Sequence, residues 1–339
     1  MMKKKFISTV SMLLAVGLLA ACGKVGTDIA NTTTGTNTGA AATTSAAKNY
    51  KVAYVARAQS DSFAAWLANA VKEEAKKYPN ITLDVFDGEA NDEKENSMIE
   101  NAITNKYDLV IVQPNNGEAQ RPYVEKVVKA GIFAITTNAR ISGIEGASSV
   151  DANPYEQAAV NARAAITQIP QNAKVVVLKG PSGNFHADER RASWQKEFFD
   201  KRPDVKIVGE QIASWNKDEA MKFMEDWVQA NDKIDAVIAM NDNMAAGALE
   251  VVKGNAKYKD MLAYGVDGTA EAILLIQEGR MTSTCMQSAY DLATKLLDTS
   301  NKLLTGVEKK VDTDIGNPLV NKANVQEYVD ILKKSGAIK

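Results

Sequence analysis

Polar and aromatic side chains follow a series of short apolar runs in this 339-residue chain. Each run has the length and composition of a buried strand, and ligands of open α/β sheets bind beyond the carboxyl ends of strands. The residues that follow the runs are Arg57, Asp61, Phe63, Gln113, Asn138, Arg190, Trp215, Asn241, Asp267 and Gln287. These types offer many donors and acceptors beside two aromatic rings, which suits a neutral, hydroxyl-rich ligand.

The sequence lacks the motifs of the enzyme classes that share such sheets. The turn after the first apolar run, residues 56–61, contains no glycine, whereas a nucleotide-dependent oxidoreductase carries Gly-x-Gly-x-x-Gly there. The loop at residues 180–183 lacks the Lys-Ser/Thr pair of a phosphate loop, and no Gly-x-Ser-x-Gly elbow occurs. We therefore expect neither an enzyme nor a cofactor.

The single histidine, His186, lies beside Asp188 and Glu189 and invites a catalytic interpretation. We expect instead a polar loop residue at the rim of the binding cleft, with ligand contact as the alternative. One histidine and two cysteines cannot build a typical zinc site, and no Asp-x-Asn-x-Asp-Gly calcium loop is present. The net charge of -2 gives no basic footprint for nucleic acid.

A regular alternation of strands and helices positions the candidate residues. Apolar β-rich runs predict strands at 51–55, 82–86, 109–112, 133–136, 175–178, 205–208, 236–239, 262–264 and 283–286. Helical spacing predicts helices at 63–78, 122–129, 187–199, 218–230, 244–252, 269–277 and 290–304. It also predicts a helix that includes residues 98–102. The pattern begins again after Asp151. It predicts an α/β fold with two doubly wound parallel-sheet lobes, each with its own core.

The first residues have the character of an export signal. Three lysines precede an apolar run that ends at Ala21, as in a secretory signal peptide. The junction Leu19-Ala20-Ala21-Cys22-Gly23 resembles the lipobox of bacterial lipoproteins, which implies that residues 1–21 are removed and that Cys22 is acylated. An ordinary cleaved leader with a chance cysteine is the alternative. Residues 22–48, rich in Thr, Ala, Asn and Gly, are expected to be a flexible tether.

Six stretches together resemble the type 1 periplasmic binding proteins, in the ribose/galactose cluster that serves sugar ABC transporters. They are residues 52–63, 108–114, 130–132, 180–190, 239–245 and 265–269, and the likeness extends over about residues 50–335. The resemblance implies two lobes joined by a three-strand hinge. The N-terminal lobe would comprise 49–152 plus 288–315, and the C-terminal lobe 153–287 plus 316–339. It also implies a monosaccharide ligand, an ABC transporter permease as partner and a monomer.

The resemblance assigns roles to the candidate residues. Phe63 and Trp215 correspond to the aromatic rings that sandwich the sugar, whose apolar C–H faces they bury. Arg190 corresponds to the family's sugar-binding arginine, and Asn241, Asp267 and Gln287 occupy the remaining polar contacts of the second lobe. Asp267 could instead cap the helix that begins near residue 269.

In the first lobe, the resemblance implies that Asp61 reads a pyranose hydroxyl, as in galactose and glucose binders. Gln113 takes the place of an asparagine. Ala64 removes one aromatic wall of the ribose pattern, and Asn138 is followed by Ala139 where the pattern has arginine. Arg57 stands where relatives have a small or aromatic residue.

These departures argue against ribose. We expect a hexose such as glucose or galactose, with a pentose, a polyol or an acidic sugar as alternatives. The expected protein is a lipid-anchored receptor on the outer face of the cytoplasmic membrane, in a periplasm or at the cell surface. Coupling to a membrane signalling partner is the alternative to transport. A sugar-responsive repressor would carry a helix-turn-helix in place of the export signal.

Overall fold

The computed structural model describes residues 48–334 and residue 338. The expected signal peptide, Cys22 and all of the expected tether except Lys48 lie outside the described residues. None of the helices between residues 48 and 334 combines the length and the apolar character that a membrane crossing requires.

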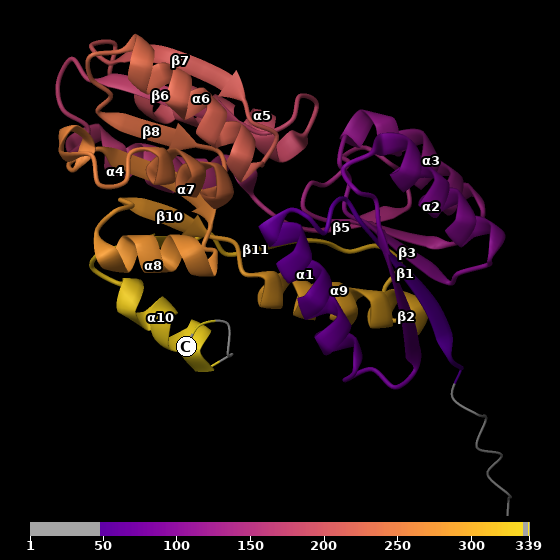
Figure 1. Cartoon of the computed structure of the whole chain (residues 1–339). Coiled ribbons are helices and arrows are strands. Elements are labelled where there is room, and N and C mark those ends of the chain that lie inside the picture. Colours follow the sequence, from indigo (N-terminus) through magenta and orange to yellow (C-terminus); the bar gives the residue numbers. More distant parts are fainter. Residues whose placement is uncertain (1–47, 335–337, 339) are drawn as a thin grey trace, which may run out of the picture. The chain divides into compact units, whose positions relative to one another are not determined.

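The first of two sheets contains six strands, all parallel (Figure 1). They are β1 (Tyr50–Ala56), β2 (Ile81–Asp87), β3 (Leu109–Val112), β4 (Phe133–Thr136), β5 (Ala147–Ala152) and β11 (Asp312–Ile315). Their order in the sheet is β11-β5-β4-β3-β1-β2. Parallel strands require crossover connections, which explains the strand–helix alternation of the sequence.

Alternate side chains of the first sheet enter two separate cores. In β1, Val52, Tyr54 and Ala56 pack against α1 (Ser62–Ala75) and α9 (Ala289–Leu304). Ala53 and Val55 point to the opposite face, where α2 (Asp92–Thr104) and α3 (Gly117–Lys129) lie. A strand segment buried on both faces has no polar side, so residues 52–56 of β1 form an unbroken apolar run.

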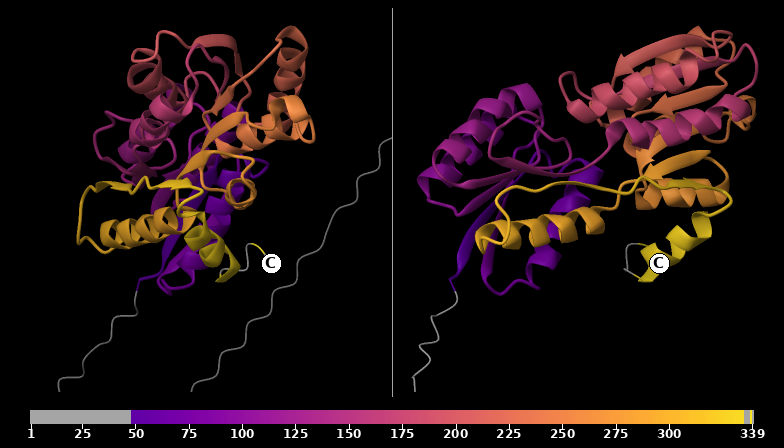
Figure 2. Two further views of the ribbon diagram at one scale, coloured as in Figure 1. Left: turned by 90° about the vertical axis from the view of Figure 1, so that its left-hand side faces the viewer. Right: turned by 180° about the vertical axis from the view of Figure 1, so that it is seen from behind.

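The second sheet also has six strands, in the order β12-β10-β9-β8-β6-β7. They are β6 (Lys174–Lys179), β7 (Lys206–Ile212), β8 (Ala236–Ala239), β9 (Leu262–Asp267), β10 (Ser283–Met286) and β12 (Leu319–Asn321). Only the edge strand β12 is antiparallel to its neighbour. Helices cover both faces of this sheet (Figure 2).

The helices of the second sheet share one continuous core. They are α4 (Pro154–Gln168), α5 (Phe185–Trp194), α6 (Lys217–Ala230), α7 (Asp242–Val251), α8 (Ala270–Glu278) and α10 (Val325–Lys334). A π-helical turn, η1 (Gln195–Phe199), continues α5, and a short 3₁₀ turn, η2 (Ala256–Tyr258), follows α7. We call each sheet with its helices a lobe.

The chain passes from one sheet to the other three times. It does so between β5 and α4, between β10 and α9, and between β11 and β12. The expected fold of two doubly wound α/β lobes is therefore confirmed. The sequence patterns did not predict β5, α4, β11, β12 or α10.

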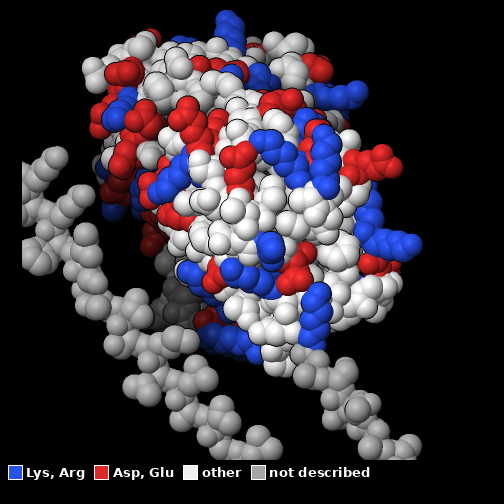
Figure 3. Space-filling view, turned by 90° about the vertical axis from the view of Figure 1, so that its right-hand side faces the viewer, with Lys and Arg blue, Asp and Glu red and all other residues white. Residues whose placement is uncertain are grey.

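Charged side chains are interspersed over the face of the molecule shown in Figure 3. Lysine and arginine lie among aspartate and glutamate there, without a field of one sign. Among the described residues, exposed charges three positions apart in the sequence pair with one another, such as Lys76 with Glu73 and Lys222 with Glu219. Such pairs keep a surface soluble and contribute little stability.

Candidate ligand-binding site

Side chains from both lobes surround one small cavity, which we call the central cavity. Its lining consists of Arg57, Phe63 and Asn138 from the first lobe, and His186, Arg190, Trp215, Asn241 and Asp267 from the second. All eight side chains are buried. The cavity volume is about 10 Å³, which is room for about one water molecule. The residues lie at or just beyond the carboxyl ends of strands, where sheets of this kind hold ligands.

Arg190 on α5 connects most of the second-lobe lining. Its Nη1 donates to the carbonyl oxygen of Met240 at 2.7 Å, and its Nη2 donates to Oε1 of Gln157 at 2.7 Å and of Gln287 at 3.1 Å. The carboxylate of Asp267 lies 3.7 Å from the same Nη2. A guanidinium fork held by so many acceptors is fixed in one orientation, so it offers a ligand a pre-organised cation.

His186 joins the two lobes. It lies in the first turn of α5, it is 3% exposed, and its Nε2 is 3.0 Å from Oδ1 of Asp151 at the end of β5. Its Nδ1 is 3.3 Å from Nη2 of Arg190. Because Arg190 can only donate, Nδ1 accepts, and Nε2 carries the proton that Asp151 accepts. The expectation of a rim loop residue was wrong, because helix α5 buries this side chain.

Trp215 lies in the loop after β7 and is held in an uncommon backbone conformation. Ser214 and Trp215 have φ of 48° and 63°, a region that disfavours residues with a Cβ. The amide nitrogens of Asn241 and Asn243 donate to the Trp215 carbonyl oxygen at 3.4 and 3.2 Å. The indole ring lies against Gly180, where a Cβ would collide with it. The site thus fixes the position of this ring from several sides.

Two cations lie close to the Trp215 ring. The guanidinium carbons of Arg57 and Arg190 are 5.8 and 5.6 Å from the ring centroid, within the range of cation–π attraction. Arg57 also pairs with Asp61 at 2.8 Å, with both side chains buried. The Asp61 carboxylate caps α1 by accepting from the backbone nitrogen of Ala64.

Asp267 has no side-chain hydrogen bond to any described residue. It ends β9 with φ of 123°, and the following helix α8 is capped by Thr269, so Asp267 is not the helix cap. Burial, partly offset by Arg190, raises the pKa of Asp267 well above its usual range. A strained residue with an unsatisfied buried acceptor is a typical feature of ligand sites.

The two predicted glutamines are buried behind the cavity lining. Gln113 donates to Oδ1 of Asn138 at 2.8 Å and accepts from the hydroxyl of Tyr54. Gln287 accepts from Arg190, and Gln157 on α4 bonds to both. Gln157 was missed because α4 was not foreseen. Asn241 lines the cavity and caps α7.

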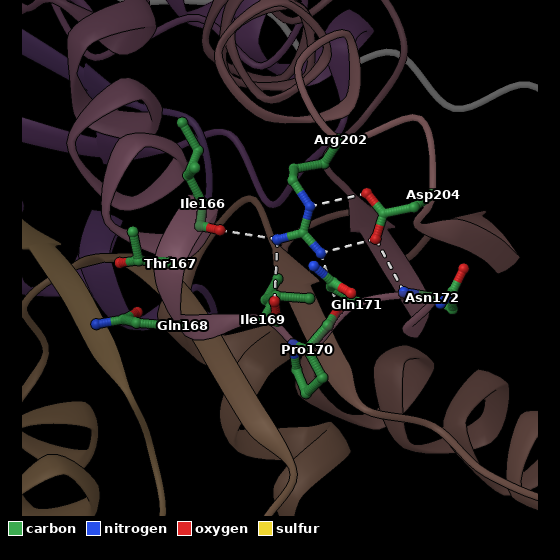
Figure 4. A pocket seen from close by; sticks show the side chains of 9 residues that line it. All are labelled: Ile166, Thr167, Gln168, Ile169, Pro170, Gln171, Asn172, Arg202 and Asp204. Atoms are coloured by element: carbon green, nitrogen blue, oxygen red, sulfur yellow. Dashed lines mark hydrogen bonds and ion pairs between the residues drawn. The ribbon is translucent and has the colours of Figure 1, made fainter.

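The described part of the chain contains no group of three His, Cys, Asp or Glu side chains placed to hold a metal ion. A wider hollow, of about 720 Å³, lies around the end of α4, near the amino ends of β6 and β7 (Figure 4). There Arg202 donates to the carbonyl oxygens of Ile166, Ile169 and Pro170 and pairs with Asp204. These groups satisfy one another, so we interpret this hollow as a helix terminus capped by arginine.

Comparison with known proteins finds relatives that bind small solutes. The family described as "Periplasmic binding protein domain" matches residues 52–308. A D-apiose import binding protein of Paraburkholderia graminis is 31% identical over 261 residues, which is 76% of this chain and 81% of that protein. Among solved structures, an ABC transporter solute binding protein from Bacillus halodurans with bound myo-inositol has a TM-score of 0.79 and 25% identity, covering 84% of this chain and 99% of that one.

A second solved structure agrees with these matches. It is an ABC transporter periplasmic solute binding protein from Actinobacillus succinogenes with bound D-allose. Its TM-score is 0.76 at 26% identity, covering 83% of this chain and 100% of that one.

Proposed function

Because this chain belongs to the periplasmic binding protein family, we propose that it captures a small hydroxylated ring between its two lobes and delivers it to an ABC transporter. The family consists of solute-binding proteins, so the expectation of a non-enzyme is confirmed. The family also places the working protein outside the cytoplasm.

The observation that carries the proposal is the shared lining of the central cavity. Each lobe alone supplies half of a site, and the contacts that complete it, such as His186 to Asp151, join the lobes. A ligand that contacts both lobes favours their closed arrangement over any open one, and its binding then becomes visible to a transporter as a change of conformation.

Unpaired polar atoms indicate the chemistry of the ligand. Oδ2 of Asp61 is an acceptor without a donor among the described residues, and Nε of Arg57 and Nε1 of Trp215 are donors without an acceptor. Asp267 makes no side-chain hydrogen bond to a described residue, and Nη2 of Arg190 lies 3.7 Å from its carboxylate. A hydroxyl group both donates and accepts, so a ring with several hydroxyls matches this mixture. Phe63 and Trp215 would cover the apolar faces of that ring.

A hexose is our preferred ligand, and a cyclitol or other polyol is the alternative. The solved relatives hold D-allose, which is a hexose, and myo-inositol, which is a cyclitol. Because one relative is a D-apiose import binding protein, a pentose is a further alternative. We propose Arg57, Asp61, Phe63, Gln113, Asn138, Arg190, Trp215, Asn241, Asp267 and Gln287 as the ligand-binding residues, and add His186.

We further propose the lobe boundaries 49–152 plus 288–315 and 153–287 plus 316–339. We also propose that the protein is a monomer and that Cys22 anchors it to the outer face of the cytoplasmic membrane. These statements rest on the sequence patterns described above.

Calorimetric titration tests the proposal. Full-length protein is titrated with glucose, galactose, allose, xylose, ribose, apiose and myo-inositol. The expected result is saturable one-to-one binding of at least one of them, at least tenfold weaker after Asp267→Ala. Glu308→Ala, in an exposed segment remote from the cavity, is the matched control. The absence of binding across the panel would contradict the proposed ligand class.

A further inference from the structure

A second cavity adjoins the central one and shares two of its walls. This adjoining cavity has a volume of about 210 Å³. Arg57 and Trp215 line both cavities, and Asp61, Asn115, Ser214 and Asn243 are further members of its lining. Residues from the first and second lobes contribute, so the adjoining cavity is likewise completed only by both lobes.

We propose that the adjoining cavity is a subsite for a neutral, hydroxyl-bearing substituent on the ring held in the central cavity. The natural ligand is then a glycoside or disaccharide rather than a free monosaccharide or cyclitol. This inference rests on the proposed function, since it extends the ligand of the same site.

The relative size of the two cavities is the first argument. The central cavity has room for about one water, so any ring must displace side chains or move the lobes to enter. The adjoining cavity is open already and is some twenty times larger. A ligand that used only the central cavity would leave this larger polar space unused beside it.

The charges of the lining define the occupant. Arg57 and Asp61 are the charged side chains of the lining, and they neutralise one another through a buried ion pair of 2.8 Å. An anionic or cationic substituent would have to break that pair, at the cost of leaving one charge buried and unpaired. The remaining polar lining consists of amide and hydroxyl side chains, which bind neutral hydroxyls.

Unsatisfied atoms lie in one wall of the adjoining cavity, on three side chains of which Arg57 and Trp215 also line the central cavity. Nε of Arg57, Oδ2 of Asp61 and Nε1 of Trp215 are buried and have no partner among the described residues. Each belongs to a side chain at most 9% exposed. Two donors and one acceptor in this wall fit the bridge between two rings, where ether oxygens accept and neighbouring hydroxyls donate.

The backbone around the adjoining cavity is strained. Ala90, Ser214 and Trp215 line it and have φ of 55°, 48° and 63°, although none is glycine. Such conformations are unfavourable for residues with a Cβ and persist only where the surrounding structure holds them in place, as it often does at ligand sites. The Asn115 loop is in turn tied to the second lobe, because Nδ2 of Asn184 donates to the Asn115 carbonyl oxygen at 3.2 Å.

Matched ligand pairs test the inference by calorimetry on full-length protein. The pairs are glucose with cellobiose and with maltose, galactose with lactose and with methyl galactoside, and myo-inositol with galactinol. We expect at least one substituted member to bind at least tenfold more tightly than its free ring. Two results would overturn the subsite and leave the proposed function intact. In the first, only the free rings bind; in the second, each free ring binds as tightly as its substituted partners.

A variant that fills the adjoining cavity gives an independent readout. Ser60 is exposed, lines this cavity and has no side-chain hydrogen bond, so Ser60→Phe adds bulk without removing a contact. We expect it to abolish the advantage of the substituted ligand and to change free-ring affinity less than twofold. Ser97→Phe, on an exposed part of α2, should change neither. If the substituted ligand still binds more tightly than the free ring after Ser60→Phe, the subsite is overturned. If no ligand binds to the unmodified protein, the proposed function is overturned as well.

Discussion

His186 and Asp151 form a buried hydrogen-bonded pair that connects the two lobes, with 3.0 Å between Nε2 and Oδ1. Burial lowers the pKa of His186, and the attraction of Asp151 offsets this only in part. Burial acts to raise the pKa of Asp151, but His186 and Arg140 outweigh it, so that pKa is lowered. At neutral pH the pair is therefore a neutral imidazole that donates to a carboxylate.

This pair predicts a loss of stability in acid. A side chain whose pKa is lower in the folded state binds fewer protons folded than unfolded, so its contribution disappears as pH falls. For His186 the loss begins at about pH 6.5, and for Asp151 it begins near pH 4. We expect the unfolding free energy of His186→Gln, measured in urea, to fall less between pH 7 and pH 5 than that of the unmodified protein.

His186 is the only histidine, so the comparison isolates one group. An equal fall in both proteins would contradict the buried pair.

Gly180 provides a second prediction, since the Trp215 ring occupies the space of its missing side chain. Gly180→Ala should displace the ring and weaken ligand binding at least tenfold, about 1.4 kcal/mol. Tryptophan fluorescence in a titration would report both effects. The control is Gly316→Ala, whose added methyl meets nothing closer than 3.9 Å. Unchanged affinity in Gly180→Ala would mean that the ring does not contact the ligand.

Glu95 predicts the opposite dependence on pH. Burial raises the pKa of this α2 carboxyl to about 8, although the backbone nitrogen of Asn115 donates to it at 3.0 Å. The folded protein therefore holds the Glu95 proton more tightly than the unfolded chain, whose carboxyl has a pKa of about 4.5. The stability that this gives is fully present below about pH 4.5 and is lost as the pH rises toward 8. Glu95→Gln should remove this loss and be more stable than the unmodified protein at pH 8.

Urea unfolding at pH 5 and pH 8 checks the difference. Glu93→Gln, on the exposed face of the same helix, should follow the unmodified protein at both values.

Arg202 predicts a stability effect without a binding effect. Its guanidinium donates hydrogen bonds to three carbonyl oxygens at the end of α4 (Figure 4). No other described side chain donates to these oxygens. Arg202→Ala should lower the unfolding free energy by about 1–3 kcal/mol, because those oxygens lose their donors. Arg163→Ala breaks a half-exposed pair and should cost less than about 1 kcal/mol. A change in ligand affinity with Arg202→Ala would contradict its placement away from the site.

The sequence predicted those parts of the fold that local patterns determine. Buried parallel strands such as β3, with the sequence Leu-Val-Ile-Val, are recognisable because both faces are apolar. Strand β5, with Ser148, Ser149 and Asp151, has no such pattern. Its side chains are instead satisfied by tertiary partners, since Ser149 bonds to Asp312 and Asp151 to His186.

The same distinction holds at the site. Residues at or just after the carboxyl ends of strands, such as Arg57, Asn241 and Asp267, could be located because the ends of the strands determine where they lie. The interlobe pair of His186 and Asp151 could not, since it joins a helix of one lobe to a strand of the other, 35 residues apart in the sequence. The adjoining cavity also depends on how loops of both lobes meet, and no local pattern encodes that.

A crystal structure of the protein with the tightest ligand of the panels tests the central claim most directly. We predict density for a hydroxylated ring between Phe63 and Trp215, with hydroxyls bonded to Asp267 and within reach of Arg190. Density in the hollow beside Arg202, or a ring held by one lobe only, would contradict the account.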